Sequence, residues 1–389
     1  MSKMSTYSTE PFRERAILVG VHMRSQSNYW NLEDSLAELF ELARAAGANP
    51  ITTLTQVLNK PSPTYVGKGK MVELNHLVKQ NHIDTAIFDD ELTPNQQKNL
   101  EDRLGIKVID RTALIIDVFA KRARSREGQL QIDLAQTEYL LPRLAGQWSH
   151  LERLGGGVGT RGPGETQIET DRRLIRRKLS LVKRELSHVS SQRHQQRQRR
   201  TGGESQIISL VGYTNAGKSA LFNRITSSRV TERNQLFSTL DTTTRRLFLP
   251  SGQPATISDT VGFVHKLPAV LVAAFRATLD EVLEADLLVQ VVDVSSPYLA
   301  EQNQVVSDQL LEMGIEDTPR ILVLNKLDLI VNSPDQPFQK DFLRTLDVRE
   351  FDRIVTTSAT RLWGIDDLLG AIDTVLPVPS RRAPADITS

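Results

Sequence analysis

Along the first third of the chain, segments with the hydrophobic spacing of a strand alternate with segments that have the spacing of a helix. Short apolar and β-branched runs predict strands, and the segments between them have the spacing of amphipathic helices. This alternation predicts a parallel sheet covered by helices, so we expect a small α/β domain over residues 12–126, with no catalytic constellation of its own. The expected strands are Ala16–Val21, Ile51–Leu58, Thr85–Phe88 and Lys107–Ile109, and the expected helices lie near 32–46, 69–80, 94–104 and 111–124.

Apolar positions in the middle of the chain follow a heptad period instead. Two such stripes joined by a loop predict an antiparallel helical hairpin over residues 127–203. Pro142 lies inside the first helix, where we expect it to kink or break that helix. The stripes are Leu130, Leu134, Thr137, Leu141, Leu144, Trp148 and Leu151, followed by Ile168, Ile175, Leu179, Val182, Leu186 and Val189.

A glycine-rich loop, GGGVGTRGPG at 155–164, joins the two helices and contains six of the chain's 22 glycines. A plain hairpin turn would need only two to five residues or so, and a floppy turn is the alternative interpretation. The loop includes Arg161, and Arg153 precedes it. We therefore favour a tip that reaches into a confined anionic site.

A third pattern follows Thr201-Gly202-Gly203, which we interpret as a linker. Buried-strand runs recur through this region, and each is followed by a polar segment. We expect a second α/β domain with a mainly parallel sheet over 205–378, and a short tail over 379–389. The runs are Ile207–Val211, Ala255–Ile257, Arg320–Leu324 and Ile354–Thr357, and a helical segment spans about 218–225.

Composition excludes several classes of protein. The 389 residues include no cysteine, which excludes disulfides and cysteine-ligated zinc or iron–sulfur clusters. No stretch approaches the ~18–20 uncharged apolar residues of a membrane span, so we expect no stable membrane insertion. We expect a cytoplasmic monomer, with at most a minor membrane-peripheral fraction.

The net charge of +1 conceals an uneven distribution of charge. Residues 172–200 contain eleven Lys or Arg residues and one acid, a balance of +10 that leaves −9 for the rest of the chain. A cationic arm of this kind indicates a polyanionic partner, although a solvated helix face is the alternative. The candidate RNA-contacting residues are Arg153, Arg161, Arg172, Arg173, Arg176 and Arg177.

One motif is typical of a phosphate-binding loop. GYTNAGKS at 212–219 matches G-x-x-x-x-G-K-[ST] and lies between an expected strand and an expected helix. Gly212 and Gly217 would let the backbone wrap around phosphates, with the helix N-terminus adding its positive dipole end. Lys218 would bridge the β- and γ-phosphates and Ser219 would bind Mg²⁺.

Two further motifs select GTP over ATP. Asp259 and Gly262 form D-x-x-G after a strand, where the carboxylate would hold Mg²⁺ through water and the Gly262 N–H would meet the γ-phosphate. Asn325-Lys326-Leu327-Asp328 also ends a strand, and Asp328 can accept hydrogen bonds from guanine N1–H and N2–H₂, donors that adenine lacks. A backbone N–H of Ser358-Ala359 could meet guanine O6.

The polar segment LFSTLDTTTRR at 236–246 is the expected switch loop. A threonine in it should complete the Mg²⁺ shell, and Thr239, Thr242, Thr243 and Thr244 are all candidates on chemistry alone. The residue after D-x-x-G is Phe263, which cannot orient water as glutamine does in Ras-like enzymes, so we expect slow intrinsic hydrolysis that a partner accelerates.

Asn215 lies within the phosphate loop, where its amide oxygen could help to bind a monovalent cation such as K⁺. The alternative is that asparagine serves only the geometry of a turn.

Together these motifs resemble those of the HflX family of bacterial ribosome-associated GTPases. The most specific segment is GGGVGTRGPGETQIETDRR at 155–173, and PSPTYVGKGK at 61–70 and the segment 110–144 extend the resemblance to about 12–378. The resemblance implies GTP hydrolysis coupled to binding of the 50S subunit, with the glycine-rich loop reaching toward the peptidyl-transferase region. It also implies that Thr239 of FSTLD is the Mg²⁺-binding threonine. Family members commonly have proline where this chain has Thr242, a departure expected to loosen the switch.

The candidate site is therefore a guanine-nucleotide site with Lys218, Thr239 and Gly262 as its catalytic residues. The metal ligands would be Ser219 and Thr239, with Asp259 acting through water. The full set is Gly212, Tyr213, Thr214, Asn215, Ala216, Gly217, Lys218, Ser219, Phe237, Ser238, Thr239, Leu240, Asp241, Asp259, Thr260, Val261, Gly262, Asn325, Lys326, Leu327, Asp328, Thr357, Ser358 and Ala359.

Two functions compete. The first is a GTPase that acts on the ribosome, by splitting or rescuing stalled or idle particles. The alternative is an RNA-binding assembly factor that uses its GTPase domain as a placement timer.

Overall fold

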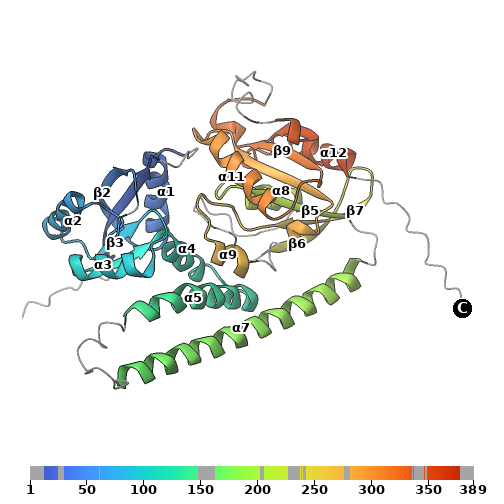
Figure 1. Ribbon diagram of the computed structural model, residues 1–389. Helices are drawn as coiled ribbons and strands as arrows, with labels where there is room; N and C mark the ends of the chain where they lie inside the picture. The colour runs from blue at the N-terminus through green and yellow to red at the C-terminus, as the bar shows by residue number, and fades with distance from the viewer. Residues whose placement is uncertain are drawn as a thin grey trace, which may run out of the picture. The chain divides into compact units, whose positions relative to one another are not determined.

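A computed structural model provides the structure of the chain (Figure 1). It forms two compact units, Met1–Val118 with Pro142–Ile168, and Phe119–Leu141 with Glu169–Ser389. The residues that the structure describes are 13–24, 30–60, 62–147, 163–201, 206–226, 237, 239, 242–275, 281–334, 336, 346 and 348–376.

The first unit contains a four-stranded parallel sheet of order β2-β1-β3-β4, as strand–helix alternation predicted. Apolar side chains from the strands and from α2 and α3 form its core. Thr93 caps α3 through a reciprocal capping box with Gln96, and Pro94 occupies the first turn. The elements are β1 (Arg15–Met23), α1 (Leu32–Ala45), β2 (Asn49–Leu58), α2 (Lys68–Gln80), β3 (Thr85–Phe88), α3 (Pro94–Leu104), β4 (Lys107–Asp110) and α4 (Arg111–Ala120).

The helical hairpin consists of α5 (Arg126–Gln147) and α7 (Pro163–Thr201), which lie side by side in Figure 1. Arg126 forms an ion pair with Glu185, and Asp133 forms one with Lys178, which gives the antiparallel order of the prediction. Side-chain burial along α7 follows the predicted stripe, because Val182 is buried and Ile175, Leu179, Leu186 and Val189 are half-buried among exposed neighbours.

Two details of the hairpin differ from expectation. The first helix does not break at Pro142 but continues through it to Gln147. The next residue, Arg143, is buried and donates to Asp110 Oδ2 at 2.9 Å and to the Leu92 carbonyl at 2.7 Å. These tertiary contacts outweigh the local cost of proline. The second difference is that α7 begins at Pro163, so the last residues of the glycine-rich segment belong to the helix.

The second unit is built on a six-stranded sheet of order β10-β9-β8-β5-β7-β6. Every neighbouring pair is parallel except β6 and β7, so the prediction of a mainly parallel sheet is confirmed. The core between this sheet and α8 and α12 is formed by fully buried residues such as Leu210, Leu221 and Ile372. The strands are β5 (Gln206–Gly212), β6 (Thr243–Phe248), β7 (Pro254–Asp259), β8 (Leu287–Asp293), β9 (Arg320–Asn325) and β10 (Arg353–Thr356); the helices are α8 (Lys218–Thr226), α9 (Ala269–Ala274), α11 (Leu299–Glu312) and α12 (Ile365–Val375).

Among the described helices, none combines the length and the apolar character that a membrane crossing requires.

Candidate functional site

The loop between β5 and α8 requires glycine at two positions. The backbone φ is 146° at Gly212 and 97° at Gly217, both in the region that side chains disfavour. A Cβ at Gly212 would lie 2.2 Å from the Val291 carbonyl oxygen, and one at Gly217 would lie 2.3 Å from Asn325 Nδ2. The phosphate loop therefore packs directly against the carboxyl ends of β8 and β9, the edge where parallel sheets bind ligands.

Lys218 begins α8 and folds its side chain back over the phosphate loop. Its Nζ donates to the carbonyls of Gly212 at 3.1 Å and Tyr213 at 3.0 Å. Burial lowers the pKa of Lys218 to about 8, and the charge of Asp259 partly opposes that change. A nucleotide phosphate bound in the loop would favour the charged ammonium, so the lysine is already placed for phosphate binding.

Three side chains meet where a metal ion would complete such a site. The Ser219 hydroxyl donates to Asp259 Oδ2 at 2.6 Å and lies 2.6 Å from Thr239 Oγ1, which is itself 3.0 Å from the same carboxylate oxygen. Burial raises the pKa of Asp259, while the hydrogen bond from Ser219 and the charge of Lys218 lower it.

The other oxygen of this carboxylate, Asp259 Oδ1, is buried and has no hydrogen-bond partner among the described residues. An unpartnered buried carboxylate oxygen is costly, and a metal-bound water would satisfy it. Two hydroxyls and a carboxylate are also the oxygen donors that Mg²⁺ prefers, so the residues present fit this ion.

The structure distinguishes between the four candidate threonines. Only Thr239 contacts Ser219 and Asp259. Thr243 and Thr244 belong to β6, where the Thr244 hydroxyl lies 3.2 Å from Ser258 Oγ. The Thr242 hydroxyl donates to Glu281 Oε1 at 3.2 Å. The geometry thus selects Thr239, the residue that the family resemblance implied.

The D-x-x-G segment contacts the phosphate loop through its backbone. A Cβ on Gly262 would lie 2.7 Å from Thr214 Cα and 2.9 Å from Lys218 Nζ, so only glycine fits. Phe263 donates its N–H to the Gly212 carbonyl at 3.1 Å and accepts the Thr214 N–H at 2.7 Å. Its ring is buried and apolar, so it cannot orient an attacking water as a glutamine at this position would.

The residues predicted to recognise the base converge from the ends of β9 and β10. Asn325 donates from Nδ2 to the Ala216 carbonyl at 3.0 Å, and its Oδ1 accepts the Thr357 hydroxyl at 3.1 Å and the Ala359 N–H at 3.2 Å. Asp328 Oδ1 accepts the Ser358 hydroxyl at 2.6 Å. Asparagine therefore joins the phosphate loop to the base-binding loops, and Ser358 fixes the orientation of the Asp328 carboxylate.

Residues 33–120 match the family model for the GTP-binding GTPase N-terminal domain, residues 122–200 that for the GTP-binding GTPase middle region, and residues 207–326 that for a 50S ribosome-binding GTPase. The GTPase HflX of Caldanaerobacter subterraneus subsp. tengcongensis is 47% identical over 364 residues, which are 93% of this chain and 80% of that protein. The GTPase HflX of Escherichia coli is 45% identical over 318 residues, 82% of this chain and 74% of that protein.

This chain belongs to the HflX family of GTPases. It is a P-loop GTP hydrolase that binds GTP and GDP. Among solved structures, a GDP complex of SsGBP aligns with 93% of this chain and 98% of that one, with a TM-score of 0.50 and 22% identity. That likeness shows a shared fold.

Several predicted residues of this HflX-family site lie outside the described part of the chain, namely Ser238, Leu240, Asp241, Arg153 and Arg161. The linker glycines, most of the glycine-rich loop and the tail over 379–389 also lie outside it. Asn215 is exposed with φ 63°, a left-handed conformation that asparagine tolerates, so the turn interpretation accounts for it and the K⁺ hypothesis stays a prediction.

The structure adds residues that sequence reasoning missed. Asp293, at the end of β8, forms a 2.7 Å ion pair with Lys326, whose backbone φ is 64°. Asp293 lies at the end of a strand, as the other motifs do, and that position could have indicated it. Glu281 contacts the switch loop through Thr242, and Phe275 packs on Phe119, the ring that contacts Phe237 of the switch loop. Nothing in the local sequence pattern indicated either residue.

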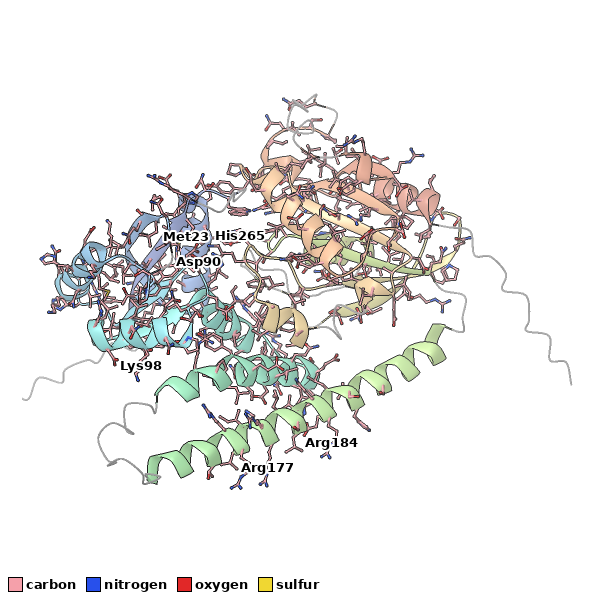
Figure 2. All side chains as sticks on the ribbon, viewed as in Figure 1. Met23, Asp90, Lys98, Arg177, Arg184 and His265 are labelled. Carbon is pink, nitrogen blue, oxygen red and sulfur yellow. The ribbon has the colours of Figure 1, made fainter. Side chains whose placement is uncertain are left out.

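Of the six candidate RNA-contacting arginines, four lie in the first half of α7. Arg173, Arg176 and Arg177 are exposed, and Arg172 is half-buried. Figure 2 shows Arg177 and Arg184 pointing away from α5, the helix that packs against the apolar stripe of α7.

Proposed function

We propose that this HflX-family GTPase uses Mg²⁺-dependent GTP binding to associate with the 50S ribosomal subunit and to split or rescue stalled or idle ribosomes. The observation that carries the proposal is the cationic face of α7, which belongs to the same compact unit as the nucleotide site. The family model that matches residues 207–326 is described as a 50S ribosome-binding GTPase, which supports the same target.

The charge on this face is available to a partner. Among the residues that the structure describes, none of Arg173, Arg176, Arg177 and Arg184 forms an ion pair. Arginines that are already paired with carboxylates would contribute little to binding, whereas four exposed guanidiniums can bind the phosphates of ribosomal RNA.

Mg²⁺ would be held by Ser219 and Thr239 and, through water, by Asp259. When bound it would neutralise charge that develops on the β- and γ-phosphate oxygens. Lys218 would hold the same phosphates, and the Gly262 N–H would orient the γ-phosphate. Phe263 cannot position the attacking water, so we propose that the ribosomal partner completes the catalytic arrangement.

Co-sedimentation with 50S subunits tests the association. We expect more protein to pellet with a non-hydrolysable GTP analogue than with GDP, and less to pellet as salt rises. The triple variant Arg173→Gln, Arg176→Gln, Arg177→Gln should pellet at least about tenfold more weakly, since each exposed phosphate contact contributes to affinity. Pelleting that depends on neither the nucleotide nor the salt concentration would contradict the proposal.

A matched control removes the same charge elsewhere. Lys68, Lys79 and Arg353 are exposed and lie outside α7. Replacing all three with glutamine should leave co-sedimentation unchanged, and an equal loss in this control would show that only net charge matters.

GTP turnover with isolated 30S, 50S and 70S particles decides between the two functions. Stimulation by mature 50S or 70S, with a loss of 70S on sucrose gradients, supports splitting. Stimulation by precursor particles alone would favour the assembly factor instead.

A further inference from the structure

Three phenylalanine rings from distant parts of the second unit pack together beside the switch loop. Phe119 is the penultimate residue of α4, Phe237 belongs to the switch loop, and Phe275 ends α9 after the D-x-x-G segment. The ring centroids of Phe119 and Phe237 are 4.4 Å apart with planes tilted by 52°, and those of Phe119 and Phe275 are 5.1 Å apart with a tilt of 55°. Phe119 is therefore the ring that the other two share.

Phe237 has a backbone conformation that needs external support. Its φ is 54°, in the left-handed region that bulky residues rarely adopt. Its N–H donates to Thr214 Oγ1 at 2.9 Å, which fixes the switch loop to the phosphate loop. Such a conformation persists only where surrounding contacts determine it. The Phe237 side chain is buried, and one of the contacts that hold it is the packing of its ring on Phe119.

Thr239 follows two residues later and occupies the metal end of the site. A rotation of the backbone at Phe237 would carry the Thr239 hydroxyl away from Ser219 and Asp259. We propose that Phe119 is a positioning residue for GTP hydrolysis, which acts through Phe237 to hold Thr239 at the metal.

The place of Phe119 in the chain gives this contact a second consequence. Its carbonyl accepts the N–H groups of Arg122 and Ala123, both at 2.9 Å, in the turn that leads into α5. The residue thus belongs to the root of the helical hairpin, and a shift of that root would move the ring against which the switch loop packs.

Substitution of Phe119 tests the proposal through a split between turnover and binding. In Phe119→Ala we expect kcat for GTP to fall by about tenfold or more, since small misplacements of catalytic groups cost this much. GDP affinity should stay within about twofold, because the phosphate-loop and base contacts remain. Hydrogen exchange of a peptide covering residues 236–242 should become faster in the presence of a GTP analogue.

The control is a substitution that creates a cavity elsewhere in the core of the same unit. Ile372 is fully buried on α12, among core residues that do not include the switch loop. Ile372→Ala should lower the melting temperature to a similar degree and leave kcat within about twofold, because large-to-small core changes act on stability. If Ile372→Ala reduced kcat as much as Phe119→Ala, the proposal would be overturned.

Phe119→Leu keeps the experiment decisive if Phe119→Ala does not fold. Leucine retains apolar volume but not the flat ring, so we expect about a threefold loss of kcat with GDP affinity unchanged. A kcat equal to that of the wild type in Phe119→Leu, with unchanged exchange of the 236–242 peptide, would overturn the proposal.

Discussion

Backbone atoms hold the key side chain of the phosphate loop in place. This residue is Lys218, whose buried Nζ contacts two carbonyls and whose pKa is lowered to about 8, chiefly by burial. The ammonium is therefore preorganised beside the loop that would bind the phosphates.

Lys218→Ala removes the one cation in the described part of the phosphate loop. We expect GTP turnover to fall by at least about 100-fold, the scale of losing a preorganised donor to developing negative charge. Steady-state phosphate release measures it, and an unchanged melting temperature would show that the fold is intact. Wild-type turnover in this variant would contradict the phosphate-site assignment.

Asp328 tests the base end of the site. Its carboxylate is oriented by the Ser358 hydroxyl at 2.6 Å, so it can accept from guanine N1–H and N2–H₂. In Asp328→Asn the amide instead matches a 2-oxo group, and we expect preference to shift from GTP toward xanthosine triphosphate by about 100-fold or more. Competition binding with both nucleotides measures the shift, and a persistent preference for GTP would show that another residue reads the base.

The residues that could be predicted from the sequence are those fixed by spacing. Gly217, Lys218 and Asn325 lie in motifs whose backbone geometry is local, and the structure brings them together. Phe119 and Glu281 could not be found this way, because their contacts with the switch loop depend on how distant segments fold back on each other.

At the level of elements, the switch loop is connected to its surroundings at both ends. Phe237 packs on Phe119 near its start, and the Thr242 hydroxyl donates to Glu281 near its end, just before β6. The residue that departs from the family pattern at 242 therefore has a hydrogen-bond partner that proline would lack. This contact opposes the loosening that the sequence alone suggested.

Thr242→Val tests this connection. Glu281 is buried, so loss of one donor to its carboxylate should destabilise the protein by about 1–3 kcal/mol and lower kcat through a looser switch. Thr244→Val is the matched control, because Thr244 is exposed on β6 and its hydroxyl lies near Ser258 of β7, so that no carboxylate is involved. Thermal unfolding and GTP turnover measure both, and equal losses in the two variants would argue against a special role for Thr242.

The hydrophobic pattern predicted strands and helices correctly where buried positions recur at regular intervals. The expected parallel strands and the apolar stripe of α7 are local signals of this kind. β8 was not among the expected strands, although its sequence is also largely apolar. β6 was missed because its alternation lies in a run of threonines and arginines that resembles a loop, and only pairing with β7 makes it a strand. A kink or a break was expected at Pro142; the helix does not break there but continues to Gln147, and contacts of the next residue, Arg143, hold it in place.

For the whole molecule, the distribution of charge matters more than its sum. A net charge of +1 predicts little, yet residues 172–200 have a balance of +10. Arg173, Arg176, Arg177 and Arg184 among them are exposed on α7. The acidic remainder should limit indiscriminate binding to nucleic acid, and the arm should concentrate binding on one helix.

The salt dependence of ribosome binding measures this arrangement directly. Each phosphate that an arginine neutralises adds about one unit to the slope of log affinity against log salt. The variant Arg173→Gln, Arg176→Gln, Arg177→Gln should therefore have a slope shallower by up to about three units, while the Lys68, Lys79 and Arg353 control keeps the wild-type slope. Both should retain intrinsic GTP turnover, because none of these residues contacts the nucleotide site. An unchanged slope in the α7 variant would mean that ribosomal RNA is bound elsewhere, and the cationic face would then be a solvated helix surface.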